Sequence, residues 1–453
     1  MKTKAITILF CTLFFVGYGQ VIEEVFPLKW KTKIGLTSYR TNMVFDEKSG
    51  QIIIGSNGDS RDDIGDSKEG VYLIDPNTGE IKQHIYPEHG MDGDVNGVAF
   101  DGQNLFFGDD AGYFYAYQNG QKLWEYNLGM GHDSYNSGDI ETCPVLTDLN
   151  GDGQKDVIFT AENWGIFALN GLDGTEIWKH LSVDGNYKAY GMNSPAVFDV
   201  NDDGVEDIIW GTRTDETYKT EEDRWGSYGD WLLALNGENG ELLWKYPTYS
   251  AINASPIVYT IKRKTYILLA ETYSGIHILN TKGKKVASWS GSIPEFGGIS
   301  AFFSSPVMND DNKLVIGTSW WGERDGVWVL DFNDLEESEV KRELNFVTAN
   351  RISASACIVD VDPSKGKEFL IPTENGQLLM FSEKGDLLKE LKLPSGAEAS
   401  VFFGDTNGDK RLELLVAALD GYLYCFETET KNKSRKTEWT SFRGNPSNNG
   451  QKK

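Results

Sequence analysis

The chain has 453 residues, and its 68 aspartates and glutamates outnumber its 43 lysines and arginines, which gives a formal net charge of −25 at pH 7. This excess of acid argues against nucleic acid or an anionic membrane surface as the partner, because both repel a negatively charged protein. A chain of this length would ordinarily form two or three domains.

The first nineteen residues, "MKTKAITILFCTLFFVGYG", have the features of an export signal. Two lysines precede an apolar stretch at 5–16 that is too short to span a bilayer, and Gly17 and Gly19 are small residues that signal peptidase accepts. We therefore expect residues 1–19 to be a signal peptide and residues 20–453 to form one exported domain, periplasmic, at the cell surface or secreted. No later segment predicts a membrane span.

An internal repeat decides the predicted architecture. The stretch "PVLTDLNGDGQKDVIFTAENWGIFALNGLDGTEIWKH" (144–180) has a counterpart that begins "PAVFDVNDDGVEDIIWGT" and ends "DWLLALNGENGELLWKY". Each predicts four short antiparallel strands separated by turns rich in Gly, Asn and Asp. The unit recurs every 45 to 61 residues, at the anchor positions Asp46, Asp101, Asp148, Asp199, Thr260, Asp310, Asp360 and Asp405.

Eight units that are each too small to bury their own faces predict an all-β, eight-bladed β-propeller. Its blades would span about 41–430 and its C-terminal tail 431–453. Fourth strands contain a tryptophan at Trp124, Trp178, Trp244 and Trp289, but the last unit has no such strand, whereas "PLKWKTKI" near the N-terminus does. We expect residues 25–35 to supply the missing strand and close the ring. Two alternatives remain open. The ring could have seven blades and an irregular segment, or the N-terminal strand could be a separate strand on blade one.

The stretches "ALNGLDGTEIWK", "ALNGENGELLWK", "LIDPNTGEIKQ" and "WTSFRGNPSNNG" resemble the quinoprotein-like (PQQ-like) β-propeller family over nearly all of residues 20–453, and the acidic turns resemble the FG-GAP or VCBS calcium loops of other propellers. The resemblance implies either a quinone-dependent dehydrogenase or a protein-binding propeller. The family's dehydrogenases have a disulfide between adjacent cysteines. This chain has none: Cys143, Cys357 and Cys425 are widely spaced and are expected to be buried and unpaired, so we expect no bound PQQ.

Three acidic loops are predicted to bind structural calcium. Oxygen ligands at positions 1, 3, 5, 7 and 9 of a tight loop suit Ca²⁺, with the backbone carbonyl serving at position 7. The predicted ligands are Asp148, Asn150, Asp152, Gln154 and Asp156; Asp199, Asn201, Asp203, Val205 and Asp207; and Asp405, Asn407, Asp409, Arg411 and Glu413. A doubtful fourth site is Asp360, Asp362 and Glu368, which lacks the central acid. Because each loop is filled by its own ligands, we expect these sites to stabilise the fold rather than to catalyse.

Long loops fall on one predicted face, formed by the second-to-third loops and the blade-to-blade crossovers. Binding residues concentrate on such loops. Candidates for ligand binding there are His132, Asp133, Tyr135, Tyr190, Trp225, Trp320, Trp321, Arg324 and Arg351, with Tyr187 and Glu323 nearby. If the protein is an enzyme, His132, Asp139 and Glu141 are the candidate catalytic residues.

Two functions follow from the sequence. The first is a calcium-stabilised, exported and monomeric binding module for a protein or a glycan, without catalysis. The second is an enzyme at the same mouth, either a polysaccharide lyase or hydrolase or, with less support, a PQQ-dependent dehydrogenase. Loss of activity on mutation of His132 would distinguish the second from the first.

Overall fold

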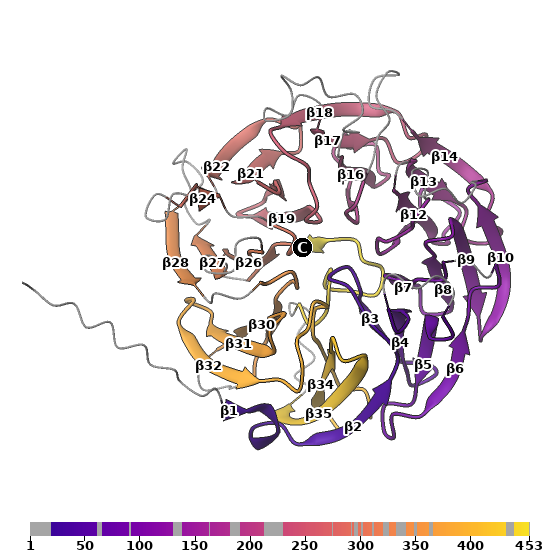
Figure 1. The fold of residues 1–453 in the computed structure, drawn as a ribbon. Helices are drawn as coiled ribbons and strands as arrows, with labels where there is room; N and C mark the ends of the chain where they lie inside the picture. The colour runs from indigo at the N-terminus through magenta and orange to yellow at the C-terminus, as the bar shows by residue number, and fades with distance from the viewer. Residues whose placement is uncertain are drawn as a thin grey trace, which may run out of the picture.

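A computed structural model shows a disc of radially arranged sheets (Figure 1). The structure describes residues 20–60, 66–89, 92–129, 138–162, 164–181, 191–212, 230–273, 275–290, 292–293, 298–299, 302–309, 312–319, 326–331, 341–347, 351–361, 366–431 and 439–452. Among them no helix is long and apolar enough to cross a membrane. The predicted signal peptide at 1–19 lies outside the described residues.

The first four blades are antiparallel sheets whose strands follow chain order from the centre of the disc outward. Blade one comprises β3 (Met43–Asp46), β4 (Gln51–Asn57), β5 (Glu69–Ile74) and β6 (Ile81–Ile85). Blade two comprises β7 (Val98–Phe100), β8 (Asn104–Gly108), β9 (Tyr113–Gln118) and β10 (Gln121–Asn127). Blade three comprises β11 (Val145–Thr147), β12 (Asp156–Ala161), β13 (Gly165–Leu169) and β14 (Glu176–His180). Blade four comprises β15 (Ala196–Phe198), β16 (Asp207–Gly211), β17 (Asp230–Leu235) and β18 (Leu242–Thr248).

The last four blades repeat this order, and the prediction of an eight-bladed propeller is confirmed. Blade five comprises β19 (Ile257–Ile261), β20 (Lys264–Ala270), β21 (Gly275–Asn280) and β22 (Lys285–Ser290). A two-stranded hairpin, β23 (Ser292–Ile293) and β24 (Gly298–Ile299), follows it. Blade six comprises β25 (Val307–Met308), β26 (Lys313–Gly317), β27 (Gly326–Asp331) and β28 (Lys341–Val347). Blade seven comprises β29 (Cys357–Val359), β30 (Glu368–Pro372), β31 (Gln377–Ser382) and β32 (Leu387–Lys392).

Blade eight contains both ends of the ring. Its inner strands are β33 (Phe402–Gly404), β34 (Arg411–Ala417) and β35 (Tyr422–Lys431), and its outer strand is β2 (Leu28–Lys33), which pairs antiparallel with β35. Closure by the N-terminal strand is therefore confirmed, with a strand shorter than the predicted 25–35. A further short strand, β1 (Gln20–Val21), adds in parallel to the outer edge of blade seven, and the 3₁₀ turn η1 (Ile22–Glu24) links it to β2.

The apolar pattern explains which strands lie inside. All six residues of β12, "DVIFTA", are buried, because this strand lies between two neighbouring sheets and packs on both faces. In contrast, β10, "QKLWEYN", alternates between exposed and half-buried residues, as expected of an outer strand with one face in solvent. The core therefore lies between successive blades rather than in one central mass.

Tryptophans on the outer strands connect each of four blades to the next. Each indole N–H donates to a backbone carbonyl in the third-to-fourth turn of the following blade. The pairs are Trp30 to Pro76 (2.8 Å), Trp124 to Gly171 (3.1 Å), Trp178 to Gly237 (2.7 Å) and Trp244 to Thr281 (3.0 Å). Trp30 makes this contact across the closure, from blade eight to blade one.

These turns need glycine beneath the indole rings. A Cβ on Gly174 would lie 2.6 Å from the ring of Trp124, and Gly174 also has a positive φ of 73°. Trp289 lies on the fourth strand of blade five, β22, as predicted, but at a different register from the other tryptophans. Ala287 takes the position that Trp178 and Trp244 occupy, opposite the third strand, and Trp289 lies two residues further on, 4.7 Å from Trp328.

A belt of serines joins blades four to eight near the axis. Each serine lies two residues before a first strand. In four of the five, the hydroxyl accepts the backbone N–H of the serine in the preceding blade. The donor and acceptor pairs are Ser194 and Ser255 (3.0 Å), Ser255 and Ser305 (2.9 Å), Ser305 and Ser355 (2.9 Å), and Ser355 and Ser400 (3.1 Å). Small hydroxyl residues fit this position because neighbouring backbones approach closely there.

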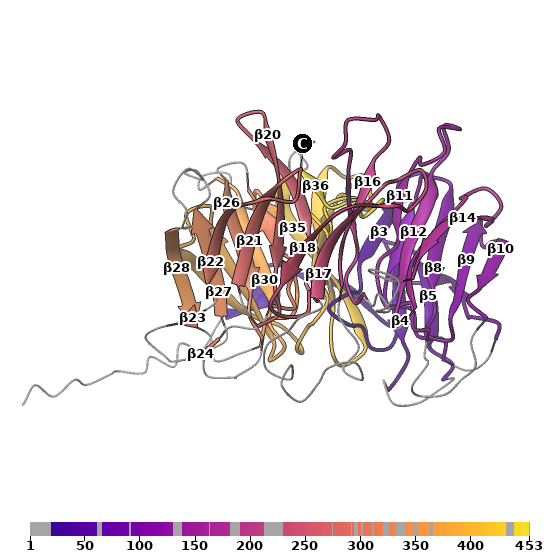
Figure 2. The ribbon, with the colours of Figure 1, turned by 90° about the horizontal axis from the view of Figure 1, so that it is seen from above.

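Residues 439–452, the axial tail, cross the centre of the ring and end in β36 (Gln451–Lys452), which pairs in parallel with β19. Carbonyls of the axial tail accept backbone N–H groups from six first strands: those of Ile358, Phe403, Phe100, Leu146, Val197 and Val258, at 2.8 to 3.2 Å. Figure 2 shows the C-terminus at the face where the β19–β20 hairpin emerges. The axial tail therefore fastens blades two to five, seven and eight to one another through backbone hydrogen bonds.

Candidate functional site

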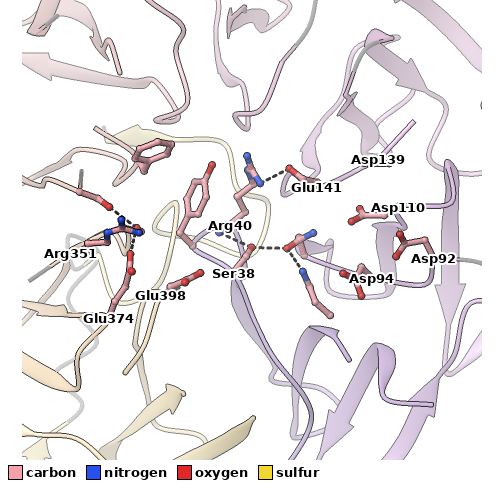
Figure 3. Close-up of a pocket in the computed structure, with 16 residues that line it drawn as sticks. Ser38, Arg40, Asp92, Asp94, Asp110, Asp139, Glu141, Arg351, Glu374 and Glu398 are labelled. Atoms are coloured by element: carbon pink, nitrogen blue, oxygen red, sulfur yellow. Dashed lines mark hydrogen bonds and ion pairs between the residues drawn. The ribbon is translucent and has the colours of Figure 1, made fainter. Parts of the chain in front are cut away.

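A cavity of about 490 Å³, the central funnel, opens at the face formed by the crossovers and the second-to-third loops (Figure 3). Its lining is Ser38, Tyr39, Arg40, Asn57, Asp92, Asp94, Asn96, Asp110, Asp139, Glu141, Phe303, Ser319, Arg351, Ser353, Glu374 and Glu398. Seven of these side chains are carboxylic acids and two are guanidinium groups. This is the face on which the sequence predicted the ligand site.

Repeat geometry explains how these residues meet. Six of them lie four residues before a first strand: Tyr39, Asp94, Glu141, Phe303, Ser353 and Glu398. Asp92, Asp139 and Arg351 lie six residues before one. Because all first strands line the axis, the same position in successive crossovers converges on one cavity. The funnel therefore collects one to three residues from each of several segments that are far apart in the chain.

Arg40 spans the funnel toward blade three. Its guanidinium forms an ion pair with Glu141, and its Nε donates to the Met192 carbonyl at 3.1 Å. It also lies 4.5 Å from the centre of the Tyr39 ring. Burial opposes the charge on Arg40, but Glu141 and the other acids outweigh this effect and raise the pKa of Arg40. One of the two cations of the funnel is thus already paired.

Two acids of blade two lie where ionisation is unfavourable. Burial, followed by the charges of Asp92 and Glu69, raises the pKa of Asp94 to about 8. Burial and the charges of Glu141 and Asp139 also raise the pKa of Asp110 well above its usual range. The Oδ1 atoms of Asp94 and Asp110 have no hydrogen-bond partner among the described residues. At neutral pH this wall of the funnel attracts a proton or a cation.

The opposite wall belongs to blades seven and eight. Ser353 donates from its hydroxyl to Glu374 Oε1 at 2.6 Å, and the Glu374 backbone N–H donates to the Arg351 carbonyl at 3.0 Å. Glu398 lies beside them (Figure 3). Tyr39 and Phe303 meet edge to face with centroids 5.8 Å apart, and they are the two aromatic rings in the described lining.

Of the site residues predicted from sequence, Asp139, Glu141 and Arg351 line the funnel. The others lie outside the described residues; they are His132, Asp133, Tyr135, Tyr187, Tyr190, Trp225, Trp320, Trp321, Glu323 and Arg324. The pairing of His132 with an acid therefore stays a prediction. Sequence reasoning missed Arg40, Asp92, Asp94, Asp110, Glu374 and Glu398. The position four or six residues before a predicted first strand was a signal that could have found Asp92, Asp94 and Glu398. Asp110 and Glu374 instead lie two residues after a second strand, and Arg40 lies three residues before a first one.

The three predicted calcium loops share one conformation. In the first, Asp148 accepts the N–H groups of Gly151 and Gly153 at 2.8 and 2.9 Å, and Asp156 accepts that of Leu149 at 2.9 Å. Asp405 and Glu413 make the equivalent bonds in the third loop. In the second loop Asp207 accepts the Val200 N–H in the same way, whereas Asp199 accepts the N–H groups of Asp203 and Gly204, at 3.2 and 2.9 Å. Lys410, which replaces the turn glycine, has a positive φ of 69°, as Gly153 (82°) and Gly204 (95°) do.

The donor chemistry of these loops fits calcium, but their oxygens cap backbone N–H groups in this structure. Within the described ranges, two groups of three acids have carboxylate oxygens within 4.8 Å of one another, and neither group lies in these loops. The groups are Glu69, Asp92 and Asp94, and Asp139, Glu141 and Glu162. In the doubtful fourth loop Glu368 accepts the Val361 N–H at 2.8 Å, whereas Asp362 lies outside the described residues. Calcium in the loops thus stays a prediction.

The three cysteines in the described part of the chain, Cys143, Cys357 and Cys425, are buried and free, as predicted. Cys143 donates to the Arg40 carbonyl at 3.1 Å and Cys357 to the Val401 carbonyl at 2.8 Å. Burial raises the pKa of the Cys143 thiol to about 12, so the thiol stays protonated at neutral pH. These cysteines therefore have a structural role.

Fold and site together define an eight-bladed β-propeller with an acidic funnel on its axis. Residues 67–257 match the family model described as outer membrane protein assembly factor BamB. No curated protein matches the chain in sequence.

Several solved structures match about nine-tenths of the chain. Quinohemoprotein alcohol dehydrogenase from Comamonas testosteroni has a TM-score of 0.64 at 14% identity, over 90% of this chain and 77% of that one. BamB from Moraxella catarrhalis has a TM-score of 0.58 at 13% identity, over 89% of this chain and 100% of that one. Sqt1 from Saccharomyces cerevisiae has a TM-score of 0.60 at 11% identity, over 88% and 99%. At such identities the likeness shows the fold alone. The predicted resemblance to the PQQ-like β-propeller family is confirmed.

Proposed function

We propose that the chain is an exported, non-catalytic binding module that receives a protein partner at its long-loop face, with a basic side chain of the partner in the central funnel. The main support for this proposal is the composition of the funnel, which contains seven carboxylic acids and two guanidinium groups. The guanidinium group of Arg40 is already paired with Glu141. A lysine or arginine from a partner would gain charge-assisted hydrogen bonds there.

Two further observations support a protein over a glycan. The family model that matches residues 67–257 is described as an outer membrane protein assembly factor, and an assembly factor acts on proteins. Glycan sites usually offer broad aromatic faces, whereas the described lining contains the rings of Tyr39 and Phe303, which contact each other. The module would act where the predicted signal peptide sends it, with calcium in the three loops as a structural support.

The test begins with capture of a partner from the envelope of the source organism, followed by measurement of its affinity in purified form. The variant Glu374→Gln with Glu398→Gln removes two funnel charges. The control, Glu238→Gln with Glu241→Gln, removes two exposed charges from a turn at the rim of blade four. We expect the funnel variant to bind at least about ten times more weakly at low salt and the control to bind as the wild type does. Equal affinity for both variants would reject the funnel as the site.

A second candidate is the enzyme. Burial and the neighbouring acids raise the pKa of Asp94 to about 8, and a protonated acid beside ionised ones is the arrangement that glycoside hydrolases use. Incubation with envelope polysaccharide separates the two functions. Shortened polysaccharide chains, lost in the Asp94→Asn variant, would favour the enzyme.

A further inference from the structure

Blade five presents a basic surface at the face opposite the funnel. From Ile257 to Ser290 it contains six lysines and arginines and one acid, Glu271, although the whole chain has a net charge of −25. Glu271 is fully buried and follows β20 at the funnel end of the blade. The six basic side chains are exposed and lie in or beside the β19–β20 and β21–β22 turns, which we call the basic turns: Lys262, Arg263, Lys264, Lys282, Lys284 and Lys285. Because the strands are antiparallel, both turns emerge at the same face (Figure 2).

The β19–β20 hairpin holds two of these cations in an unfavourable backbone conformation. Lys262 and Arg263 form its two-residue turn, with φ angles of 48° and 68°. Two successive positive φ angles are typical of a type I′ turn, for which Asn-Gly is a preferred sequence. Lysine and arginine are therefore less favourable for folding at these positions, and residues in such conformations are concentrated at functional sites.

The charges of the basic turns are not neutralised within the described part of the chain. None of the six side chains forms an ion pair there, in contrast to Lys122 and Lys313, which pair with neighbouring acids. Tyr266 lies opposite Asn280 in the pairing of β20 with β21, so the two turns belong to neighbouring strands. Six positive charges on adjacent turns create a local positive potential on an otherwise acidic protein.

A pocket of about 350 Å³ lies beside the basic turns, between blades four and five. Its lining is Phe198, Asp199, Val200, Asp202, Lys264, Thr265, Tyr266, Asn280 and Thr281. Phe198 and Val200 are half-buried, so they offer apolar surface to an occupant. Asp199 and Asp202 make the blade-four wall acidic, and this wall repels a bare anion. The pocket therefore suits a molecule that combines negative charges with an apolar group.

We propose that the basic turns and this pocket bind an acidic peptide segment of a partner protein, at a surface separate from the funnel and independent of the function proposed above. Consecutive aspartates or glutamates of the segment would pair with the basic turns, and an apolar side chain beside them would enter the pocket. An anionic membrane surface fits less well, because neighbouring loops on this face expose acids that include Asp152, Asp203 and Asp409.

The probe is a fluorescein-labelled peptide of consecutive glutamates that ends in leucine, and fluorescence anisotropy at low salt measures its binding to residues 20–453. The first variant, Lys262→Asn with Arg263→Gly, installs the sequence that the turn prefers. We expect it to bind the peptide at least about five times more weakly than the wild type and to unfold at the same or a higher temperature. Weaker binding by a protein that is at least as stable cannot be a loss of fold.

A second variant, Lys282→Gln with Lys284→Gln, removes two charges from the other turn and should weaken binding similarly. The matched control, Lys384→Gln with Lys389→Gln, removes two exposed lysines of blade seven and should bind as the wild type does. A peptide with glutamine in place of glutamate should not bind.

Three results would overturn the proposal. The first is absence of binding by the glutamate peptide, or equal binding by the wild type and both turn variants. The second is tighter binding to vesicles that contain phosphatidylglycerol than to the peptide, which would assign the surface to a membrane. The third is self-association in sedimentation that both turn variants lose, which would make the occupant a second copy of this chain.

Discussion

Arg443 is the residue on which we expect the axial tail to depend. Its side chain is 1% exposed, and it donates to the carbonyls of Pro195 at 2.6 Å, Pro256 at 2.7 Å and Asn448 at 3.2 Å. Burial lowers the pKa of Arg443 to about 9, so the side chain is still charged at pH 7. It thereby joins the axial tail to blades four and five through a buried charge whose partners are carbonyl dipoles.

Replacement of Arg443 by methionine keeps most of its volume and removes three hydrogen bonds. Bonds to a charged group contribute about 1.5 to 3 kcal/mol each, or roughly 5 to 9 kcal/mol in total. The variant no longer buries a charge, which recovers several kcal/mol. We therefore expect the free energy of unfolding to fall by about 3 to 5 kcal/mol in total. With an unfolding entropy of about 2.1 cal/mol/K per residue over about 430 residues, a loss of about 4 kcal/mol lowers Tm by roughly 4 °C.

Calorimetric unfolding at pH 7 measures this shift, and Arg263→Met, at an exposed arginine, is the control that should leave Tm unchanged. An Arg443→Met variant as stable as the wild type would refute the reasoning. It would mean that the cost of burying the guanidinium equals or exceeds its hydrogen bonds.

Three further predictions test the closure, the loops and one histidine. Trp30→Ala should lower the free energy of unfolding by about 3 to 5 kcal/mol, because a buried indole and its hydrogen bond to Pro76 are removed from the closing strand. Thermal unfolding measures this change, and a decrease of less than about 1 kcal/mol would contradict the role of this strand in closing the ring. Chelation of calcium should lower Tm, since each occupied loop adds about 1 to 2 kcal/mol at millimolar calcium; an unchanged Tm would reject the loop assignment. Burial lowers the pKa of His180, whose Nδ1 lies 3.1 Å from the Gly240 carbonyl. As the pH falls below about 6.5, the unfolded chain therefore binds a proton at this histidine before the folded chain does. The free energy of unfolding should accordingly decrease toward about pH 5. His180→Gln should flatten this part of the curve of Tm against pH, and parallel curves would show that His180 does not contribute.

The amino-acid sequence by itself determined the blades and their closure. Strand length, the alternation of apolar residues and the acidic turns are local properties, and their repetition predicts the number of blades without knowledge of contacts. The Trp30 segment was identifiable because blade eight lacked a fourth strand that a distant segment possessed. Trp289 lies on a fourth strand as predicted, but the composition of its motif did not show that it lies two residues past the position of Trp178 and Trp244.

Only the tertiary structure decided the composition of the funnel and the path of the axial tail. Tyr39, Asp94, Glu141 and Glu398 are each unremarkable in their own loops and become a site because ring closure brings the same position of six segments before first strands to the axis. Residues 439–452 have no apolar periodicity, since they are held by backbone hydrogen bonds to six blades. Backbone pairing of this kind depends on shape rather than side-chain pattern, and it exists only once the ring has closed.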